Sequence, residues 1–384
     1  MSRNYTRRRF LTATTSALAL PLVAACQAPV AAPSTPAATA KPAATEPPKP
    51  AATTAAAAAP APTQAPAAAK PLQRVSCRLC WLKNGEFAAL LNAAAEGYYQ
   101  AEGLEMDLRP GGAGIDPLPL VAGKSEEFGV VAGSGQLIAA VVNGKMPLKF
   151  IGTLMQKSPS GFMYLLKDGE QPDKRTPKDW KGAKVGVQAE GIITVKIIAA
   201  MNGLTEKDYE IVVAGTGPEQ LLAGQIDYFN GWNTNQAWTL QKAGKKWGFI
   251  NSTDYIPHYA DLLFARSDVL DANPDLAKRF VRATMKGLQL GIDNPKKTAE
   301  NIVKLGDKQD LEQNTWRMGV QNTMVTSDDT RKNGLGYMSP DRVKKISQIM
   351  YDTTEGTGAD AKRQLSRVPE ANEVMTNDFL PGKA

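Results

Sequence analysis

The sequence predicts an α/β protein with two lobes and a ligand cleft between them. Strand and helix patterns alternate in two successive series, joined by loops of only a few residues. Such repeated units indicate parallel sheets that are covered by helices. After Pro274 the pattern becomes almost wholly helical until about Tyr351. Residues 72–384, the predicted folded part, exceed the length of one ordinary domain, so two lobes are expected.

The first series accounts for most of the predicted first lobe, which comprises residues 72–161 and 265–384. Its expected strands are 74–82, 105–109, 128–132 and 148–156, and its expected helices are 87–100 and 136–143. Ser134 follows the third strand and is expected to cap the next helix, because a serine oxygen can accept a hydrogen bond from a free helical N–H.

The second series makes up the predicted second lobe, residues 162–264. Its expected strands are 162–167, 184–188, 209–213, 225–229 and 246–251, with helices at 192–201, 218–223 and 235–243. A further strand is expected at 262–266. The segments 160–166 and 258–266 are the predicted crossings between the lobes, and hinge closure is expected around them.

The charge distribution excludes a nucleic-acid partner. The whole chain carries +7, but residues 1–26 contribute +4 and residues 27–71 contribute +2, which leaves +1 for the folded part. That part therefore has no basic footprint for nucleic acid. His258 is the one histidine, which argues against a histidine-rich metal site, and a structural role is expected for it. No metal and no cofactor are predicted.

The N-terminus indicates export and anchoring. Arg7-Arg8-Arg9-Phe10-Leu11 matches the twin-arginine pattern, and residues 1–25 are predicted to be a signal peptide. The apolar run from 11 to 25 is shorter than the roughly twenty residues that span a bilayer. Small residues before Cys26 resemble a lipobox, so Cys26 is the predicted lipidation site; the alternative is an ordinary cleaved signal. These patterns predict a location on the extracytoplasmic face, with the protein bound to the cell membrane through its lipid alone. The protein is expected to be a monomer.

Residues 26–71 are predicted to be a tether. Residues 27–71 contain 20 alanines and 11 of the 26 prolines. Proline at this density interrupts an alanine helix and favours an extended spacer with nothing to bury. The tether is therefore expected to hold the folded part away from the membrane.

Short segments in a characteristic order suggest a family. They are Gly97-Tyr98-Tyr99, Glu102-Gly103-Leu104, Pro110-Gly111-Gly112, Gln156-Lys157-Ser158-Pro159, Pro177-Lys178-Asp179-Trp180-Lys181-Gly182, Leu221-Leu222-Ala223-Gly224-Gln225-Ile226-Asp227 and Asn273-Pro274-Asp275-Leu276. Together they resemble the NMT1/THI5-like solute-binding proteins, especially the riboflavin-binding lipoproteins, from about Val75 to about Lys304. The resemblance implies the type II periplasmic binding protein fold and delivery of a solute to an ABC permease with its ATPase.

The ligand is expected at the carboxyl ends of the strands, where helix N-termini offer free N–H groups. These corners are rich in aromatic and uncharged polar side chains and poor in lysine and arginine, which favours a flat heterocycle over a phosphate. Trp180, Trp247 and Trp316 are expected in the core. The predicted ligand-binding residues are Trp81, Asn84, Glu86, Phe87, Ser134, Gln156, Tyr164, Glu190, Tyr228, Asn230, Trp232, Asn233, Asp254 and Tyr255.

One departure from the family pattern bears on the ligand. Pyrimidine-binding members often begin with Asp-Trp-x-Pro-Asn, whereas this chain has Cys80-Trp81-Leu82-Lys83-Asn84. The loss of the aspartate favours a neutral ring over a protonated aminopyrimidine. Cys77 and Cys80 form a C-x-x-C pair without a second pair, so they are expected to be strand residues and not a zinc site.

Three functions remain open at this stage. The first is a membrane-anchored receptor that captures riboflavin for an importer, with riboflavin as transported ligand. The second is the same receptor for a thiamine-precursor pyrimidine of the hydroxymethylpyrimidine type. The third is an enzyme similar to the eukaryotic relatives, which make a pyrimidine phosphate from pyridoxal phosphate and histidine. Their cysteine-rich segment is absent here, so no enzymatic activity is expected.

Overall fold

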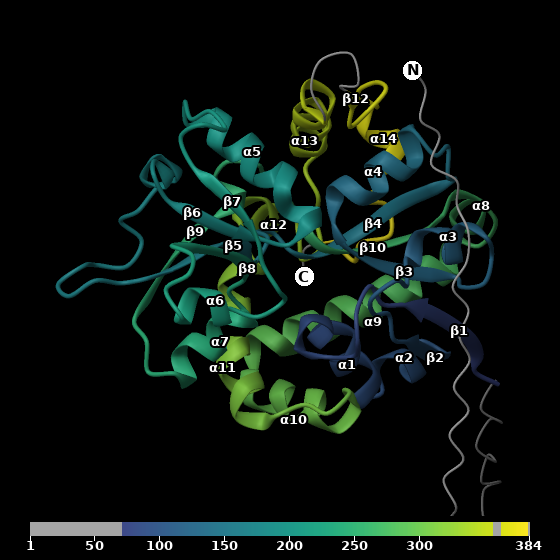
Figure 1. The fold of residues 1–384 in the computed structure, drawn as a ribbon. Coiled ribbons are helices and arrows are strands. Elements are labelled where there is room, and N and C mark those ends of the chain that lie inside the picture. The colour runs from purple at the N-terminus through teal and green to yellow at the C-terminus, as the bar shows by residue number, and fades with distance from the viewer. Residues whose placement is uncertain (1–70, 356–361, 383–384) are drawn as a thin grey trace, which may run out of the picture. The chain divides into compact units, whose positions relative to one another are not determined.

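The structure is a computed structural model that describes residues 71–355 and 362–382. The predicted signal peptide, Cys26 and all but the last residue of the tether lie outside these residues. The described chain contains two five-stranded sheets, each packed between helices (Figure 1). Within the described residues, no helix combines the length and apolar character that crossing a membrane requires.

The first sheet has the strand order β2-β1-β3-β10-β4. Its strands are β1 (Gln73–Arg78), β2 (Leu104–Arg109), β3 (Phe128–Gly133), β4 (Leu148–Met155) and β10 (Ala260–Arg266). β1 is parallel to β2 and β3, whereas β10 is antiparallel to both of its neighbours. The sheet is therefore mixed, and not wholly parallel as the strand–helix alternation predicts.

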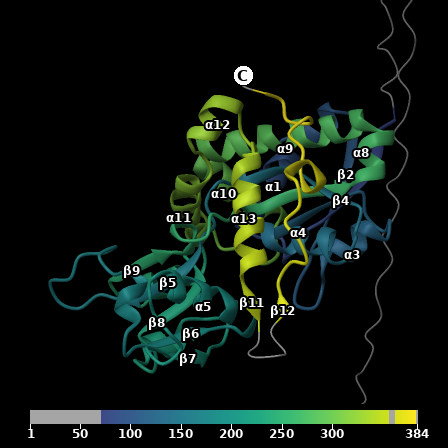
Figure 2. The same cartoon turned by 90° about the horizontal axis from the view of Figure 1, so that it is seen from above.

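Helices cover both faces of the first sheet (Figures 1 and 2). On one face, Phe128 of the sheet stacks on Phe280 of a long helix with ring centroids 4.0 Å apart. The helices of this face are α1 (Ala88–Ala95), α2 (Tyr98–Ala101) and α9 (Pro274–Asp293). The opposite face packs against α3 (Pro117–Ala122), α4 (Ser134–Val142), α13 (Pro340–Asp352) and α14 (Ala371–Val374). The remaining helices of the C-terminal half are α8 (Ser267–Ala272), α10 (Pro295–Leu305), α11 (Leu311–Gln321) and α12 (Asp328–Asn333).

The second sheet has the order β7-β6-β8-β5-β9. Its strands are β5 (Ser160–Leu165), β6 (Lys184–Val187), β7 (Glu210–Val213), β8 (Tyr228–Trp232) and β9 (Trp247–Asn251), with helices α5 (Ile192–Met201), α6 (Glu219–Leu222) and α7 (Gln236–Lys242). Trp180 is fully buried against this sheet, as predicted. Trp247 and Trp316 are partly buried, and they pack against a second hydrophobic cluster of the same lobe.

The chain passes between the sheets at residues 156–159 and 252–259. The first passage ends before the predicted crossing 160–166, and the second overlaps the predicted crossing 258–266 only at residues 258 and 259. The predicted crossings instead contain β5 and β10. β10 lies in the first sheet, although the predicted second lobe extends to residue 264. The pattern of β10 did not reveal its sheet, because all its side chains are buried and buried strands of either lobe look alike.

A single guanidinium holds both passages. Arg342 of α13 donates from Nη2 to the carbonyl oxygens of Gln156 (2.6 Å) and His258 (2.7 Å), and from Nε to that of Pro257 (2.8 Å). The same guanidinium lies 3.9 Å from the ring centroid of Tyr259. Because its donors are shared between the two passages, Arg342 fixes their relative position at the root of both lobes.

Some local predictions need correction. Ser134 is the first residue of α4 and not its cap; Gly133 precedes the helix, and its N–H reaches Oε1 of Gln136 (3.4 Å). The predicted helix 87–100 is broken at Gly97, whose φ of 71° ends one helix and begins the next. β1 ends at Arg78, so Cys80 lies in a loop, while Cys77 is a strand residue as predicted.

The strand expected at 225–229 begins three residues later, at Tyr228. The Asp227 carboxylate accepts a hydrogen bond from the backbone N–H of Lys184 in β6 (2.8 Å), and the Asp227 N–H donates to the Lys184 carbonyl oxygen (2.9 Å). Side-chain acceptors of this kind compete with regular strand pairing.

Replacing Gly287 with alanine is expected to destabilise the fold. A Cβ at Gly287 would lie 2.0 Å from the carbonyl oxygen of Ala89, so α1 and α9 would have to separate. The free energy of unfolding should fall by about 1–3 kcal/mol, measured by urea denaturation. Gly319→Ala in α11 is the control, because a Cβ there meets no atom within 4 Å. An equal loss for both variants would contradict this packing argument.

His258 is expected to stay neutral well below its ordinary range. Burial, helped by the charge of Arg342, lowers the pKa of His258 from 6.5 to about 4. Since the unfolded chain then binds more protons, stability should fall as pH decreases from about 6.5 towards 4. With one histidine in the chain, proton NMR should show one imidazole that is unprotonated at pH 5 and titrates near 6.5 in urea. A native midpoint above pH 6 would contradict the prediction.

Candidate functional site

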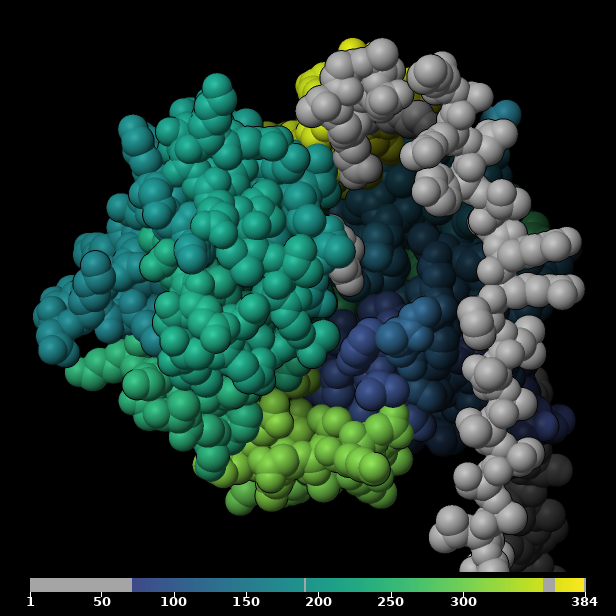
Figure 3. Space-filling model, viewed as in Figure 1, coloured from purple at the N-terminus to yellow at the C-terminus, as the bar shows by residue number. Residues whose placement is uncertain are grey.

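A cavity of about 800 Å³ opens between the two sheets, at the carboxyl ends of their strands. In the space-filling view, a hollow separates the teal residues of the second lobe from the blue residues of the first (Figure 3). Residues of β3 and α4 and the loops after β1, β2, β6, β7 and β8 contribute to its wall. The lining residues are Cys80, Trp81, Asn84, Glu86, Gly114, Ile115, Asp116, Pro117, Val131, Ala132, Gln136, Gln188, Thr216, Trp232, Thr234, Asn235, Gln236 and Arg317.

Two tryptophans bring aromatic surface to the cavity from opposite lobes. Trp81 follows β1 and is 42% exposed, and Trp232 ends β8 and is partly buried. Gln236 accepts a hydrogen bond from the Trp232 backbone N–H (2.9 Å) and donates to the Thr216 carbonyl oxygen (3.0 Å). Its amide therefore joins the loops after β7 and β8. The wall combines ring faces with uncharged amides and hydroxyls, which suits a flat ring with polar edges.

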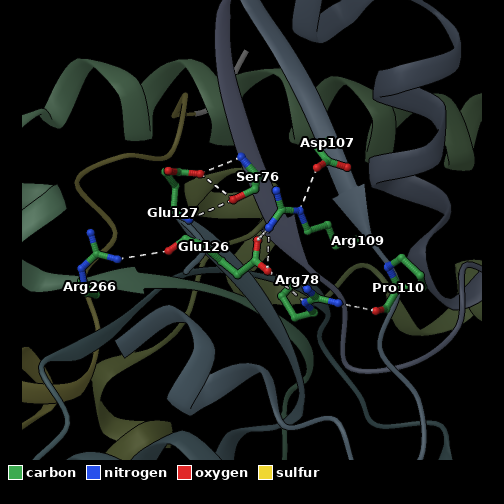
Figure 4. Close-up of polar contacts among 8 residues, drawn as sticks. All are labelled: Ser76, Arg78, Asp107, Arg109, Pro110, Glu126, Glu127 and Arg266. Atoms are coloured by element: carbon green, nitrogen blue, oxygen red, sulfur yellow. Dashed lines mark hydrogen bonds and ion pairs between the residues drawn. The ribbon is translucent and has the colours of Figure 1, made fainter. Parts of the chain in front are cut away.

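A buried ion-pair network holds the root of one cavity loop (Figure 4). Glu126, which precedes β3, pairs with Arg78 (2.7 Å) and Arg109 (3.1 Å) from the ends of β1 and β2. Arg78 also donates to the carbonyl oxygen of Pro110 (2.8 Å), the first residue of the loop that leads to Ile115. The Glu126 side chain is 1% exposed, so these charges fix the start of the loop against the sheet.

Three acidic groups meet beside the cavity. Ligand atoms of Cys80, Glu86 and Asp261 lie within 4.8 Å of one another, and the Cys80 Sγ is 3.8 Å from a Glu86 oxygen. Asp261 of β10 is fully buried, and neither of its carboxyl oxygens has a hydrogen-bond partner among the described residues. Burial raises the pKa of both carboxyls and of the thiol, and the proximity of Glu86 raises the pKa of Asp261 further.

Arg317 of α11 lies against this cluster and connects the lobes. Its Nη1 donates to Oδ1 of Asn84 (3.2 Å) in the first lobe, and its Nη2 donates to Oδ1 of Asn235 (3.2 Å) in the second. A Cβ at position 85 would lie 2.6 Å from the Arg317 Cδ, so Gly85 permits this approach. Burial lowers the pKa of Arg317. The guanidinium also opposes a metal cation at the acidic groups by charge repulsion.

Four of the predicted ligand-binding residues line the cavity: Trp81, Asn84, Glu86 and Trp232. Phe87 and Ser134 are fully buried beside it, Phe87 within the core of the first lobe. Gln156 is buried in the first crossing, where its amide donates to the Tyr337 carbonyl oxygen (2.8 Å). Gln156 therefore supports the crossing and does not line the cavity.

The other predicted ligand-binding residues lie in the second lobe and its passages, outside the cavity wall. Tyr164 and Tyr228 pack beneath the guanidinium of Arg175, 4.5 Å and 5.7 Å from their ring centroids. Asn230 donates to the Gly161 carbonyl oxygen (3.0 Å).

Four predicted ligand-binding residues remain, and the three whose side chains are described also lie outside the cavity wall. Asp254 is exposed and lies 3.9 Å from the Lys157 Nζ. Tyr255 packs against the core of the second lobe. The Asn233 backbone N–H donates to the Pro159 carbonyl oxygen (3.0 Å), which places Asn233 at the first crossing. Glu190 is in a short 3₁₀ helix, and its side chain lies outside the described residues.

Several site residues were not predicted. Three of them, Gln136, Gln188 and Asn235, lie at or after the carboxyl ends of predicted strands, where the ligand is expected. Their polar side chains could therefore have identified them as ligand-binding residues. Arg317 and Asp261 carried no such signal. Arg317 reaches the cavity from a helix more than two hundred residues after β1, and Asp261 comes from a strand whose neighbours are apolar.

The model of the family described as NMT1/THI5 like matches residues 84–298. The chain belongs to this family. The match confirms the resemblance predicted from the short sequence segments.

Two sequence relatives and one solved structure that resemble this chain are named for different ligands. The riboflavin-binding protein RibY of Chloroflexus aurantiacus is 24% identical over 324 residues, covering 82% of this chain and 88% of its own. The formylaminopyrimidine-binding protein of Halalkalibacterium halodurans is 24% identical over 232 residues, covering 58% and 68%. The periplasmic aliphatic sulphonate-binding protein SsuA of Escherichia coli aligns with a TM-score of 0.59 at 11% identity, covering 81% and 94%. This likeness confirms the type II periplasmic binding protein fold.

Glu126→Gln is expected to weaken the fold at the cavity loop. The variant leaves Arg78 and Arg109 without their buried counter-charge. The free energy of unfolding should fall by about 1–3 kcal/mol, as for hydrogen bonds to charged groups. Glu105→Gln is the matched control, because the exposed pair of Glu105 with Arg74 should contribute less than about 1 kcal/mol. Urea denaturation of both variants tests the difference, and indistinguishable midpoints would contradict it.

Proposed function

We propose that this protein is the substrate-binding component of an ABC importer and captures a flat, uncharged heterocycle, with riboflavin as the first candidate. The observation that carries the proposal is the cavity between the lobes, where Trp81 and Trp232 bring ring faces from opposite sheets. Membership of a family rich in solute-binding proteins and the likeness to the riboflavin-binding protein RibY support it.

The cavity wall favours a neutral ligand. Among its described lining residues, the charged side chains are Glu86, Asp116 and Arg317. Asp116 caps α3 by accepting a hydrogen bond from the Leu118 N–H (2.9 Å), and Arg317 donates to two asparagines. No further lysine or arginine lines this part of the wall, so a multiply charged phosphate would lack counter-charges.

A flat ring gains from this wall in two ways. Stacking on a tryptophan contributes about 1–3 kcal/mol per ring, by analogy with nucleobases. The amides of Gln136, Gln188 and Gln236 supply both donors and acceptors for polar ring edges. The same groups suit the ribityl hydroxyls of riboflavin. Stacking and hydrogen bonding together can therefore bind a ligand that carries no charge.

Closure of the lobes would convert binding into a signal for the permease. The passages 156–159 and 252–259 connect the lobes, and ligand contacts to both walls would stabilise a closed form. A ligand shifts this equilibrium only by the difference between its affinities for the two forms. Residues of both lobes line the cavity, so one ligand could contact both walls in a closed form.

The remaining parts of the proposal rest on the N-terminal sequence. A twin-arginine signal, a lipidated Cys26 and an alanine- and proline-rich tether would hold a monomeric receptor on the extracytoplasmic face of the cell membrane. Its partners there would be an ABC permease and its ATPase. No catalytic step is proposed, since the sequence lacks the cysteine-rich segment of the enzymes that the chain resembles.

Riboflavin fluorescence tests the ligand. The purified chain should quench it with sub-micromolar affinity, and Trp232→Ala should weaken binding tenfold or more, about 1.4 kcal/mol, because it removes one ring face. Trp247→Phe is the control, since Trp247 lies on the edge strand β9 and does not line the cavity. Failure to quench riboflavin would remove the ligand assignment, and equal losses in both variants would remove the role of Trp232.

A thiamine-precursor pyrimidine is the second candidate. The likeness to the formylaminopyrimidine-binding protein favours it. Competition between riboflavin and hydroxymethylpyrimidine for the same cavity distinguishes the two.

A further inference from the structure

We infer that Glu86 and Asp261 share one proton in the binding-competent protein, and that Glu86 thereby selects uncharged heterocycles whose ring edge carries an acceptor beside a donor. The inference rests on the proposed binding function and narrows its ligand class. Glu86 is the group that would touch the ligand, because it lines the cavity. Asp261 is a positioning residue, because it is fully buried and would act through Glu86.

The geometry places both carboxyls in one small space. Their oxygens lie with the Cys80 sulfur inside a 4.8 Å cluster. Asp261 has no hydrogen-bond donor among the described residues for either oxygen, although its side chain is fully buried. A fully ionised carboxylate in that position would bear a large desolvation cost without compensation. A single proton held by the pair removes one of the two negative charges.

Asp261 is also held in an uncommon backbone conformation. Its φ is +51°, a left-handed value within a β-strand, where such a value costs free energy for any residue except glycine. The strand thus carries strain at the residue that faces Glu86. Asparagine tolerates this conformation about as well as aspartate, so Asp261→Asn is a variant that should fold.

The charges around the pair come from three elements. The loop after β1 contributes Cys80, whose buried thiol is uncharged at neutral pH because burial raises its pKa. β10 contributes Asp261 itself. α11 contributes Arg317, whose Nη atoms donate to Asn84 and Asn235 and not to either carboxyl. One guanidinium therefore balances one negative charge, and the second carboxyl keeps a proton.

A proton on the pair changes what the cavity can recognise. A carboxylate only accepts hydrogen bonds, whereas a carboxylic acid donates one and accepts another. When the ligand binds, the proton lies on Glu86 and the remaining negative charge lies on Asp261, near Arg317. Glu86 then matches a ring edge with an acceptor next to a donor, such as the lactam edge of a flavin or the amino and ring-nitrogen edge of a neutral aminopyrimidine. A protonated aminopyrimidine, which has donors alone on that edge, would be disfavoured. Aliphatic solutes would lack such an edge.

The test measures riboflavin affinity of the purified chain, in EDTA, between about pH 5 and pH 9. Because ionisation of the shared proton removes the donor, affinity should fall tenfold or more as pH rises through this range. Glu86→Gln keeps one donor and one acceptor without an ionisable proton, so its affinity should stay within threefold of the low-pH value and not change with pH. Asp261→Asn removes the neighbouring acid, so Glu86 should ionise earlier and the loss should move to lower pH.

Difference infrared spectroscopy of the ligand-free protein separates this inference from the proposed function. The spectrum of the unmodified chain minus that of Glu86→Gln at neutral pH should contain the carbonyl band of a protonated carboxylic acid. The band should also be reduced in Asp261→Asn. Absence of the band overturns the shared proton whether or not riboflavin binds. Its presence together with pH-independent binding of riboflavin and of hydroxymethylpyrimidine overturns the role of Glu86 in selection. If neither compound binds at any pH, the ligand assignment fails, while the band still decides the state of the pair.

Discussion

The guanidinium of Arg342 is the constraint on which the two-lobed arrangement depends. Two separate passages join the sheets, and the relative position of the two sheets depends on both passages being held together. Arg342 donates to carbonyl oxygens of both, at Gln156 and at Pro257 and His258. Backbone carbonyls that are taken out of water need such partners. One side chain of α13 thus supplies donors to both passages at once.

The cavity follows from how those passages enter the sheets. Each returning strand, β5 in the second sheet and β10 in the first, lies antiparallel between strands of the other direction. The remaining strands keep their carboxyl ends towards the space between the lobes, so their loops meet there. The strands hold the wall rigidly, while the loops supply Trp81, Trp232 and the amides.

The charged side chains near the cavity form two groups. The ion pairs of Glu126 lie behind the loop and fix its position, whereas the wall itself is mostly uncharged. The exception is the group of Glu86, Asp261 and Arg317, where two acids face one guanidinium. If the two acids share a proton, as we infer, a wall with few charges can still discriminate between ring edges.

The sequence by itself determined the α/β class, the family and most strands and helices, because apolar periodicity and short turns report local structure directly. It also located the loops after β1 and β8, and with them Trp81 and Trp232. The tertiary structure alone decided that β10 pairs in the first sheet and that Asp261 and Arg317 reach Glu86. Such contacts join segments some two hundred residues apart, and no local pattern encodes which distant side chains share a buried space.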